Sequence, residues 1–176
     1  DLGLTPSDNS FVCVDGEDAV PDMLIGRIPG GSPAETSGTI DKLLATEVRR
    51  LVPVRRVLLV ADNDDSDFET INNQVLDFLP RDYSAVKVYL RAYGNTSQAT
   101  ADIVEAIDGG VDLVSYVGHG TATDWASEQI FGTSKVALLS NAAHLPLFFA
   151  FNCLNGFFSG TSQDCLAEAV VGAAGK

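Results

Sequence analysis

Basic residues are few in this sequence. Its 176 residues include 11 lysines and arginines against 24 aspartates and glutamates, which gives a net charge of −13. Nucleic-acid binding needs clustered basic side chains to contact phosphates, so this balance argues against a nucleic-acid partner. The acidic balance favours solubility and attraction of basic partners, although a solvated acidic surface is the simpler interpretation.

Cysteine and long apolar runs are also scarce. Three cysteines, an odd number, do not form a disulfide framework, and an unpaired cysteine raises the question of a chemical role. No apolar run reaches the roughly 18 residues that cross a bilayer, so we expect no membrane segment. The first ten residues lack the basic start and apolar stretch of a signal peptide, as a mature or shortened chain would also do.

Residues 1–53 read as an irregular segment with short strands, followed by a helix. Two apolar stretches, residues 11–14 and 23–28, are the strand candidates. Ser32, Pro33 and Glu35 then have the spacing of a helix cap, a first-turn proline and a capping box. The apolar residues of this helix share one face, which we expect to pack on the core: Ile40, Leu43, Leu44, Val48 and Leu51.

Residues 54–176 alternate strands with helices. Four apolar runs have strand length: residues 57–61, 85–90, 111–117 and 145–151. Helical patterns follow them at residues 68–79, 99–107, 134–139 and 166–170. Continuous apolar strands separated by helices are typical of a mostly parallel sheet covered on both faces. We therefore expect an α/β sandwich whose site lies beyond the carboxyl ends of the strands.

Two of these strands run into residues that carry chemistry. The third continues into Gly118-His119-Gly120 and the fourth into Asn152-Cys153. Parallel strands end on the same rim, and the axes of neighbours lie about 4.8 Å apart, so the two tips would face one crevice. An imidazole beside a thiol takes its proton during attack and later protonates the leaving amine. The N–H groups of Gly120 and Cys153 would then form an oxyanion hole.

Each turn has a simpler explanation when it is taken alone. A Gly-His-Gly sequence is more often a tight connection, and a cysteine after an apolar strand is ordinarily core packing. The two turns follow consecutive strands in a chain with only two histidines. On spacing and chemistry alone, the catalytic and structural interpretations are evenly balanced.

A longer series of segments around both turns favours the catalytic interpretation. They are residues 116–120, Trp125, and residues 131–133, 139–141, 145–146, 152–157 and 165–169. In this order they resemble the gingipain family of cysteine peptidases, which belongs to clan CD and has the caspase-like fold. Weaker similarity extends upstream to residues 22–29, so the resemblance covers nearly the whole chain. It implies a caspase-like three-layer α/β/α sandwich with Cys153 as nucleophile, His119 as acid/base and Gly120 as an oxyanion donor.

The resemblance also implies roles for an acidic loop after the first strand. Asp64 best matches the acid that orients the imidazole, with Asp62 and Asp65 as alternatives. Asp67 resembles the pocket acid of the Arg-specific members, which would favour cleavage after Arg or Lys; the simpler interpretation is an exposed acidic loop or a helix cap. Trp125 would either wall the substrate cleft or pack in the core.

The resembling enzymes continue with further strands after the segment that matches this chain. We therefore expect an incomplete sheet, completed by a second chain or a C-terminal segment. A cut after Lys176 would agree with a basic preference, which makes self-processing into two chains a further hypothesis. The resemblance implies a secreted or surface-bound protein that acts on protein or peptide substrates without a required cofactor. It also suggests structural calcium in the acidic loops, although no EF-hand pattern is present.

Three other functions compete with a peptidase. A non-catalytic binding or scaffold domain on the same fold is the main alternative, although a decayed site usually loses its cysteine, histidine or oxyanion glycine. A nucleotide-binding domain would need GxGxxG or GxxxxGK[ST] after a strand, and neither occurs. A zinc site built from Cys153, His119 and Cys165 lacks CxxC or HxxxH spacing.

Overall fold

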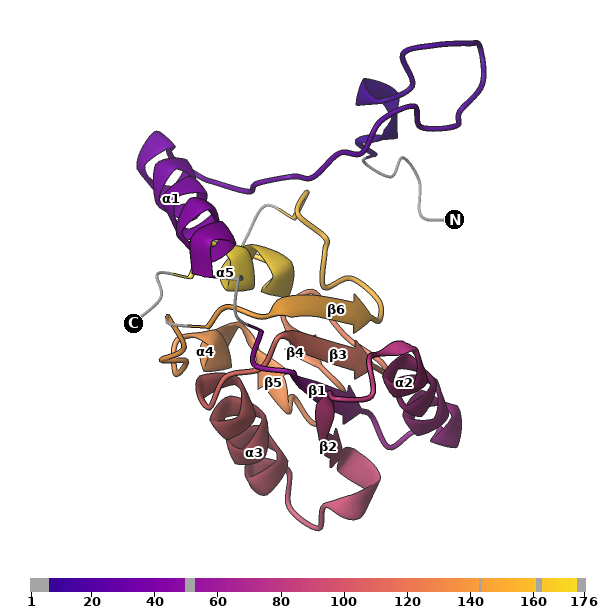
Figure 1. Ribbon diagram of the computed structural model, residues 1–176, viewed down its shortest axis with the longest axis vertical. Coiled ribbons are helices and arrows are strands. Elements are labelled where there is room, and N and C mark those ends of the chain that lie inside the picture. Colours follow the sequence, from indigo (N-terminus) through magenta and orange to yellow (C-terminus); the bar gives the residue numbers. More distant parts are fainter. Residues whose placement is uncertain (1–6, 50–52, 143, 161–162, 174–176) are drawn as a thin grey trace.

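A computed structural model describes residues 7–49, 53–142, 144–160 and 163–173 of the chain (Figure 1). Lys176 and Leu51, and the side chain of Val48, lie outside what it describes. The elements, in chain order, are η1 Asn9–Phe11, α1 Pro33–Arg49, β1 Arg56–Ala61, α2 Ser66–Phe78, β2 Ser84–Tyr89, η2 Leu90–Ala92, α3 Thr96–Asp108, β3 Leu113–Val117, β4 Asp124–Trp125, β5 Phe131–Gly132, α4 Thr133–Val136, β6 Leu147–Phe151 and α5 Leu166–Gly172.

The four expected strands form one sheet in the order β2-β1-β3-β6, and every neighbouring pair is parallel. This confirms the predicted α/β class. The short antiparallel pair β4–β5 was not predicted, because two residues per strand are too few to give a periodic signal. It follows the histidine turn directly and folds back on it, with Gly120 opposite Trp125.

Helices cover the two faces of the sheet unequally. On one face, α3, the β4–β5 pair, α4 and α5 enclose the main core; its largest buried side chains are Trp125, Tyr116, Phe131, Leu58, Ile103, Ile107 and Ile130. On the other face α2 lies over β1 and β3 (Figure 1). There the buried Asn72 donates to the Val60 carbonyl at 2.7 Å and accepts from the Ser115 hydroxyl at 2.7 Å.

Strand β6 is the uncovered edge of this sheet. Phe149 is in register with Ser115, so its side chain lies on the α2 face, yet it is 49% exposed. Leu147 and Phe151 share that face and are about as exposed. Among the described residues no strand pairs with the outer side of β6. The sheet therefore ends in a bare apolar edge.

The first helix begins as expected, but the strands before it do not form. Ser32 Oγ accepts the Glu35 N–H at 3.3 Å, and the Glu35 carboxylate reaches back to the Gly31 N–H at 2.8 Å. The strand predictions at residues 11–14 and 23–28 are wrong: these stretches form a 3-10 turn and irregular chain. The Asp22 carboxylate takes the Val14 and Asp15 N–H groups, which a partner strand would otherwise bind.

Helix α1 stands beside α5 rather than on the sheet (Figure 1). The Lys42 ammonium donates to the carbonyls that end α5, including that of Ala173 at 3.0 Å. Its burial lowers the pKa of Lys42. The expected packing of the apolar face is not seen among the described residues, where Ile40, Leu43 and Leu44 are largely exposed.

Candidate active site

The ends of β1, β3 and β6 lie side by side on one rim. Val117 is in register with Ala61 on one side and with Phe151 on the other. The lateral bonds continue past the strands, since the Asp62 N–H donates to the Val117 carbonyl at 3.1 Å. His119 and Cys153 therefore each stand two residues beyond a register pair on adjacent strands, with the acidic loop next to them.

The backbone of His119 is fixed at both of its polar groups. Its N–H donates to Asp62 Oδ2 at 3.0 Å, and Asp62 is fully buried. Its carbonyl accepts from the Tyr116 hydroxyl at 2.6 Å and from the Ala126 N–H at 2.9 Å. Burial, and then the charge of Asp62, raise the pKa of the Tyr116 phenol, so it stays a donor at neutral pH.

The imidazole itself is exposed and has two neighbours. The Phe68 ring meets it edge-on, with centroids 5.6 Å apart and planes at 85°. Asp64 Oδ2 lies 4.0 Å from His119 Nε2. Both side chains are more than half exposed, so the contact is loose and solvated.

The acidic residues of the loop have separate positions. Asp62 binds the His119 backbone, and Asp64 faces the ring. Asp65 is the N-cap of α2, where its Oδ1 accepts the Asp67 N–H at 2.9 Å. Asp67 lies in the first turn of α2 with its side chain exposed. Arg91 holds the loop in place by donating to the Asn63 carbonyl at 3.0 Å.

Cys153 is exposed and stands at a strained turn. The next residue, Leu154, has a φ of 66°, and the Asn155 N–H donates to the Cys153 carbonyl at 3.0 Å. A bond from residue i+2 back to residue i around a positive φ is a γ-turn of the rare, strained kind. Such backbone persists where surrounding structure fixes it, and it clusters at functional sites.

Two backbone donors are free at this rim. Among the described residues, neither the Gly120 N–H nor the Cys153 N–H has a hydrogen-bond acceptor. The backbone of Gly120 also lies so close to the Asn152 side chain that a Cβ there would be 1.9 Å from Asn152 Nδ2. The bare backbone of Gly120 thus packs directly against the residue that precedes Cys153.

Trp125 lies in the core beneath the histidine turn. It is 1% exposed, and its ring stacks on Tyr116 with centroids 4.4 Å apart and planes at 8°. Of the two expectations for Trp125, this position matches core packing, because the buried ring leaves no surface for a substrate. Cys165 is buried as well, at the start of α5, and burial raises the pKa of its thiol.

Several residues of the rim were missed in the sequence. Phe68 was placed only on the inner face of a helix, and Tyr116 was quoted in a strand and a motif without a role. Asn152 and Asn155 were quoted as part of a motif without a role. The available signal was position, since all four lie within four residues of a chemically active turn or of the acidic loop.

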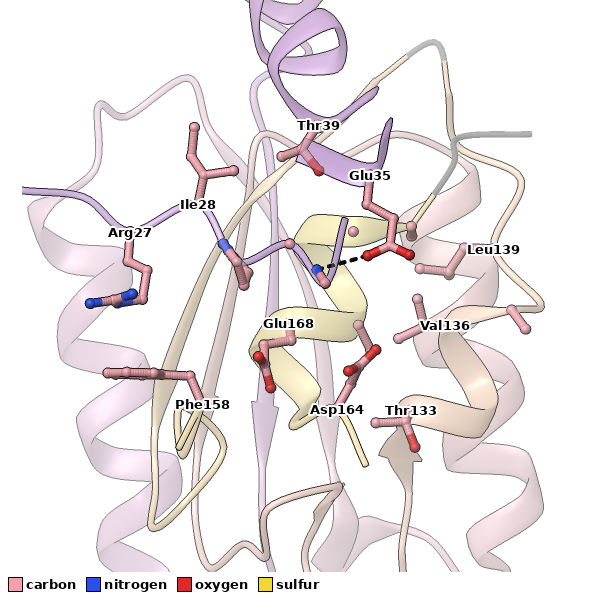
Figure 2. Close-up of a pocket in the computed structure, with 17 residues that line it drawn as sticks. Arg27, Ile28, Glu35, Thr39, Thr133, Val136, Leu139, Phe158, Asp164 and Glu168 are labelled. Carbon is pink, nitrogen blue, oxygen red and sulfur yellow. Dashed lines mark hydrogen bonds between the residues drawn. The ribbon is translucent and has the colours of Figure 1, made fainter. Parts of the chain in front are cut away.

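One cavity of the described structure lies away from this rim. About 700 Å³ in volume, it lies between the segment before α1, α4, α5 and the loop after Cys153 (Figure 2). Its lining carboxylates include Glu35, bonded to the Gly31 N–H, and Glu168, bonded to the Cys165 N–H at 2.9 Å. Arg27 at its mouth stacks on Phe158, 4.4 Å from the ring centroid. None of the expected site residues lines it.

In the described part of the chain, no three His, Cys, Asp or Glu side chains converge as metal ligands would, so no calcium ligands are assigned. The same residues contain no helix long and apolar enough to cross a membrane.

Comparison with known proteins identifies the family of this chain. A family model described as "Peptidase family C25" matches residues 3–176. Gingipain R2 of Porphyromonas gingivalis is 31% identical over 182 residues, which cover 96% of this chain and 24% of that protein. Lys-gingipain W83 of the same species is 26% identical over 93% of this chain and 10% of its own length. The chain thus spans about a quarter or less of these relatives.

Solved structures agree with the sequence matches. The Arg-specific cysteine proteinase gingipain R superposes with a TM-score of 0.72 at 30% identity, covering 96% of this chain and 40% of that one. The complex of the pro- and mature domains of Porphyromonas gingivalis RgpB gives a TM-score of 0.74 at 28% identity, with 97% and 41% covered. The predicted resemblance and fold are therefore confirmed, and the chain belongs to peptidase family C25, the gingipain family of cysteine peptidases.

Proposed function

We propose that the protein containing this chain is a cysteine endopeptidase that works through a thioacyl-enzyme on Cys153. The observation that carries the proposal is the position of His119 and Cys153, each two residues past a register pair on adjacent parallel strands. Membership of the C25 family supports the same chemistry.

The proposed reaction uses four residues of the rim. His119 takes the thiol proton as the Cys153 sulfur attacks the substrate carbonyl, and the N–H groups of Gly120 and Cys153 bind the resulting oxyanion. The intermediate collapses when His119 protonates the leaving amine. Water then hydrolyses the thioester, with His119 again accepting a proton. Asp64, 4.0 Å from Nε2, would orient the imidazole.

For specificity we propose a basic residue before the cut, recognised through Asp67. This carboxylate is exposed and accepts no hydrogen bond from the described residues, so its charge is available to a guanidinium or ammonium group. The relatives include proteins named as Arg-specific and as Lys-gingipain, so the matches support a basic preference without separating the two.

We also propose that further chain completes the sheet at β6. No described residue pairs with the outer edge of β6, and Phe149 on one of its faces is 49% exposed; an apolar edge is normally paired or covered in a native protein. The solved relatives are more than twice as long as the segment matched. The occupant would be a strand from the same protein or its processed second chain. Self-processing after Lys176 and structural calcium stay predictions, and secretion is proposed from the family resemblance alone.

A positional-scanning peptide library, applied to the complete protein, tests activity and specificity together. The expected result is cleavage after Arg or Lys, lost in Cys153→Ala and His119→Ala. Asp67→Asn should lose the basic preference while still cleaving other peptides slowly. Failure to turn over any peptide, with no labelling of Cys153 by a peptidyl acyloxymethylketone, would instead favour a non-catalytic scaffold.

A further inference from the structure

Asn155 joins the two catalytic turns through its side chain. Its Nδ2 donates to the Thr121 carbonyl at 2.6 Å, directly after Gly120 in the chain. Its Oδ1 accepts from Asn152 Nδ2 at 2.7 Å, directly before Cys153. The side chain is 5% exposed. One buried carboxamide therefore spans the gap between the histidine turn and the cysteine turn.

The backbone around Asn155 is bound to the same two turns. Its N–H closes the strained turn on the Cys153 carbonyl, and its own carbonyl accepts the Ala167 N–H at 3.0 Å. The Leu166 N–H, next to it at the start of α5, donates to the Ala122 carbonyl at 2.8 Å. The first free donors of α5 are thus satisfied by one carbonyl from each turn. The start of α5 holds both turns in one arrangement, with Asn155 between them.

We propose that Asn155 is a positioning residue for the Cys153–His119 pair, an inference that rests on the function proposed for those two residues. Its carboxamide sets the separation of the two turns, and through Asn152 it fixes the residue against which Gly120 packs. The positive φ at Leu154 costs energy, so the cysteine turn would relax to another backbone conformation if nothing held it. The hydrogen bonds of Asn155 oppose that relaxation. Asn155 itself does not touch substrate.

Alkylation of Cys153 by iodoacetamide, followed by mass spectrometry at several pH values, tests this in the complete protein. The variants are His119→Ala, Asn155→Ala, the double variant and Asn155→Asp. Asp keeps the size of Asn and an acceptor for Asn152 but, when ionised, has no donor for Thr121. Asn155→Asp therefore removes the donation to Thr121, together with the longer contact of the same Nδ2 to the Asp124 carbonyl at 3.5 Å, and it replaces Asn155→Ala in the cycle if the latter does not fold.

We expect Asn155→Ala to slow alkylation near neutral pH by about tenfold, the size of coupling found between contacting residues. In the His119→Ala background the same change should have little further effect. Peptide hydrolysis should lose kcat with KM nearly unchanged. Asn72→Ala is the matched control: Asn72 is equally buried with two side-chain bonds, but it lies under the middle of the sheet. It should lower the thermal midpoint as much without slowing alkylation.

Three results would overturn the inference. If both Asn155 variants are alkylated at the wild-type rate, Asn155 does not position the pair. An equal loss with and without His119 means that Asn155 acts on the thiol independently of the pair. If His119→Ala itself alkylates like the wild type, the proposed catalytic pair is wrong, and the positioning role falls with it.

Discussion

Asp62 holds His119 by its backbone and not by its ring: the buried carboxylate accepts the His119 N–H at 3.0 Å, and its other oxygen accepts the Asn63 N–H at 2.7 Å. The ring is left to Phe68 and Asp64. Two aspartates that are nearly adjacent in sequence therefore have different physical roles. One accepts a hydrogen bond from the backbone of the histidine, and the other lies beside its ring.

This division predicts different effects for two substitutions. Asp62→Ala leaves two N–H groups without an acceptor, so it should lower the free energy of unfolding by about 1–3 kcal/mol for each. Asp64→Ala removes an exposed side chain and should leave stability unchanged. We expect Asp64→Ala to lower kcat, by no more than the roughly 10²–10⁴-fold that acid/base catalysis supplies. Urea unfolding and peptide hydrolysis measure the two effects, and a stability loss in Asp64→Ala equal to that in Asp62→Ala would contradict the division.

A second prediction concerns the close approach at Gly120. In Gly120→Ala the new methyl group would lie 1.9 Å from Asn152 Nδ2 and 3.2 Å from the Asp124 carbonyl, and Asn152 Nδ2 is bonded to Asn155, so we expect the two turns to shift apart. Because the shift moves both proposed oxyanion donors, we expect kcat to fall by about 10²-fold or more.

Gly156→Ala is the control for this change. It lies in the same turn as Cys153, but no atom would come within 4 Å of its new Cβ. Its thermal midpoint should match that of the wild type, whereas the midpoint of Gly120→Ala should fall. Equal midpoints for the two variants would mean that the Asn152 contact relaxes without cost.

The rim was predictable from sequence because its position follows from strand length and parallel order alone. Apolar runs located β1, β3 and β6 to within two residues, and the carboxyl ends of parallel strands must meet on one side. The roles of Asp62, Asp64 and Asp65 were not predictable, since three carboxylates within four residues have the same chemistry. Only the backbone path of the loop buries the first, turns the second to the imidazole and makes the third a helix cap. The bonds of Asn155 depend in the same way on two loops folding together.

A third prediction addresses the bare edge of β6. If further chain covers this face in the complete protein, Phe149→Ser removes a buried ring there and should destabilise it by about 3–5 kcal/mol. Phe78→Ser is the control, because Phe78 is 89% exposed at the end of α2 and does not belong to β6. Thermal unfolding of both variants decides the matter. Equal and small shifts would mean that the edge stays uncovered.

The fourth prediction is a loss of stability at high pH that originates in one buried and two half-buried tyrosines. Burial is the largest cause that raises the pKa of Tyr89 and of Tyr93 to about 12, and it raises that of Tyr116 further. An unfolded tyrosine ionises near pH 10, so the folded state binds more protons above that pH. Stability contributed by these phenols is therefore complete below about pH 10 and is lost as the pH rises through 12.

Tyr116→Phe separates the contribution of one ring. It cannot ionise, so its stability should fall less steeply between pH 10 and 12, although at pH 7 it lacks the bond to the His119 carbonyl and should be less stable by about 0.5–1.5 kcal/mol. The two unfolding curves should approach each other as the pH rises. Parallel curves across this range would show that the Tyr116 phenol ionises as easily in the folded protein as in the unfolded chain, and that the hydroxyl does not hold the histidine turn.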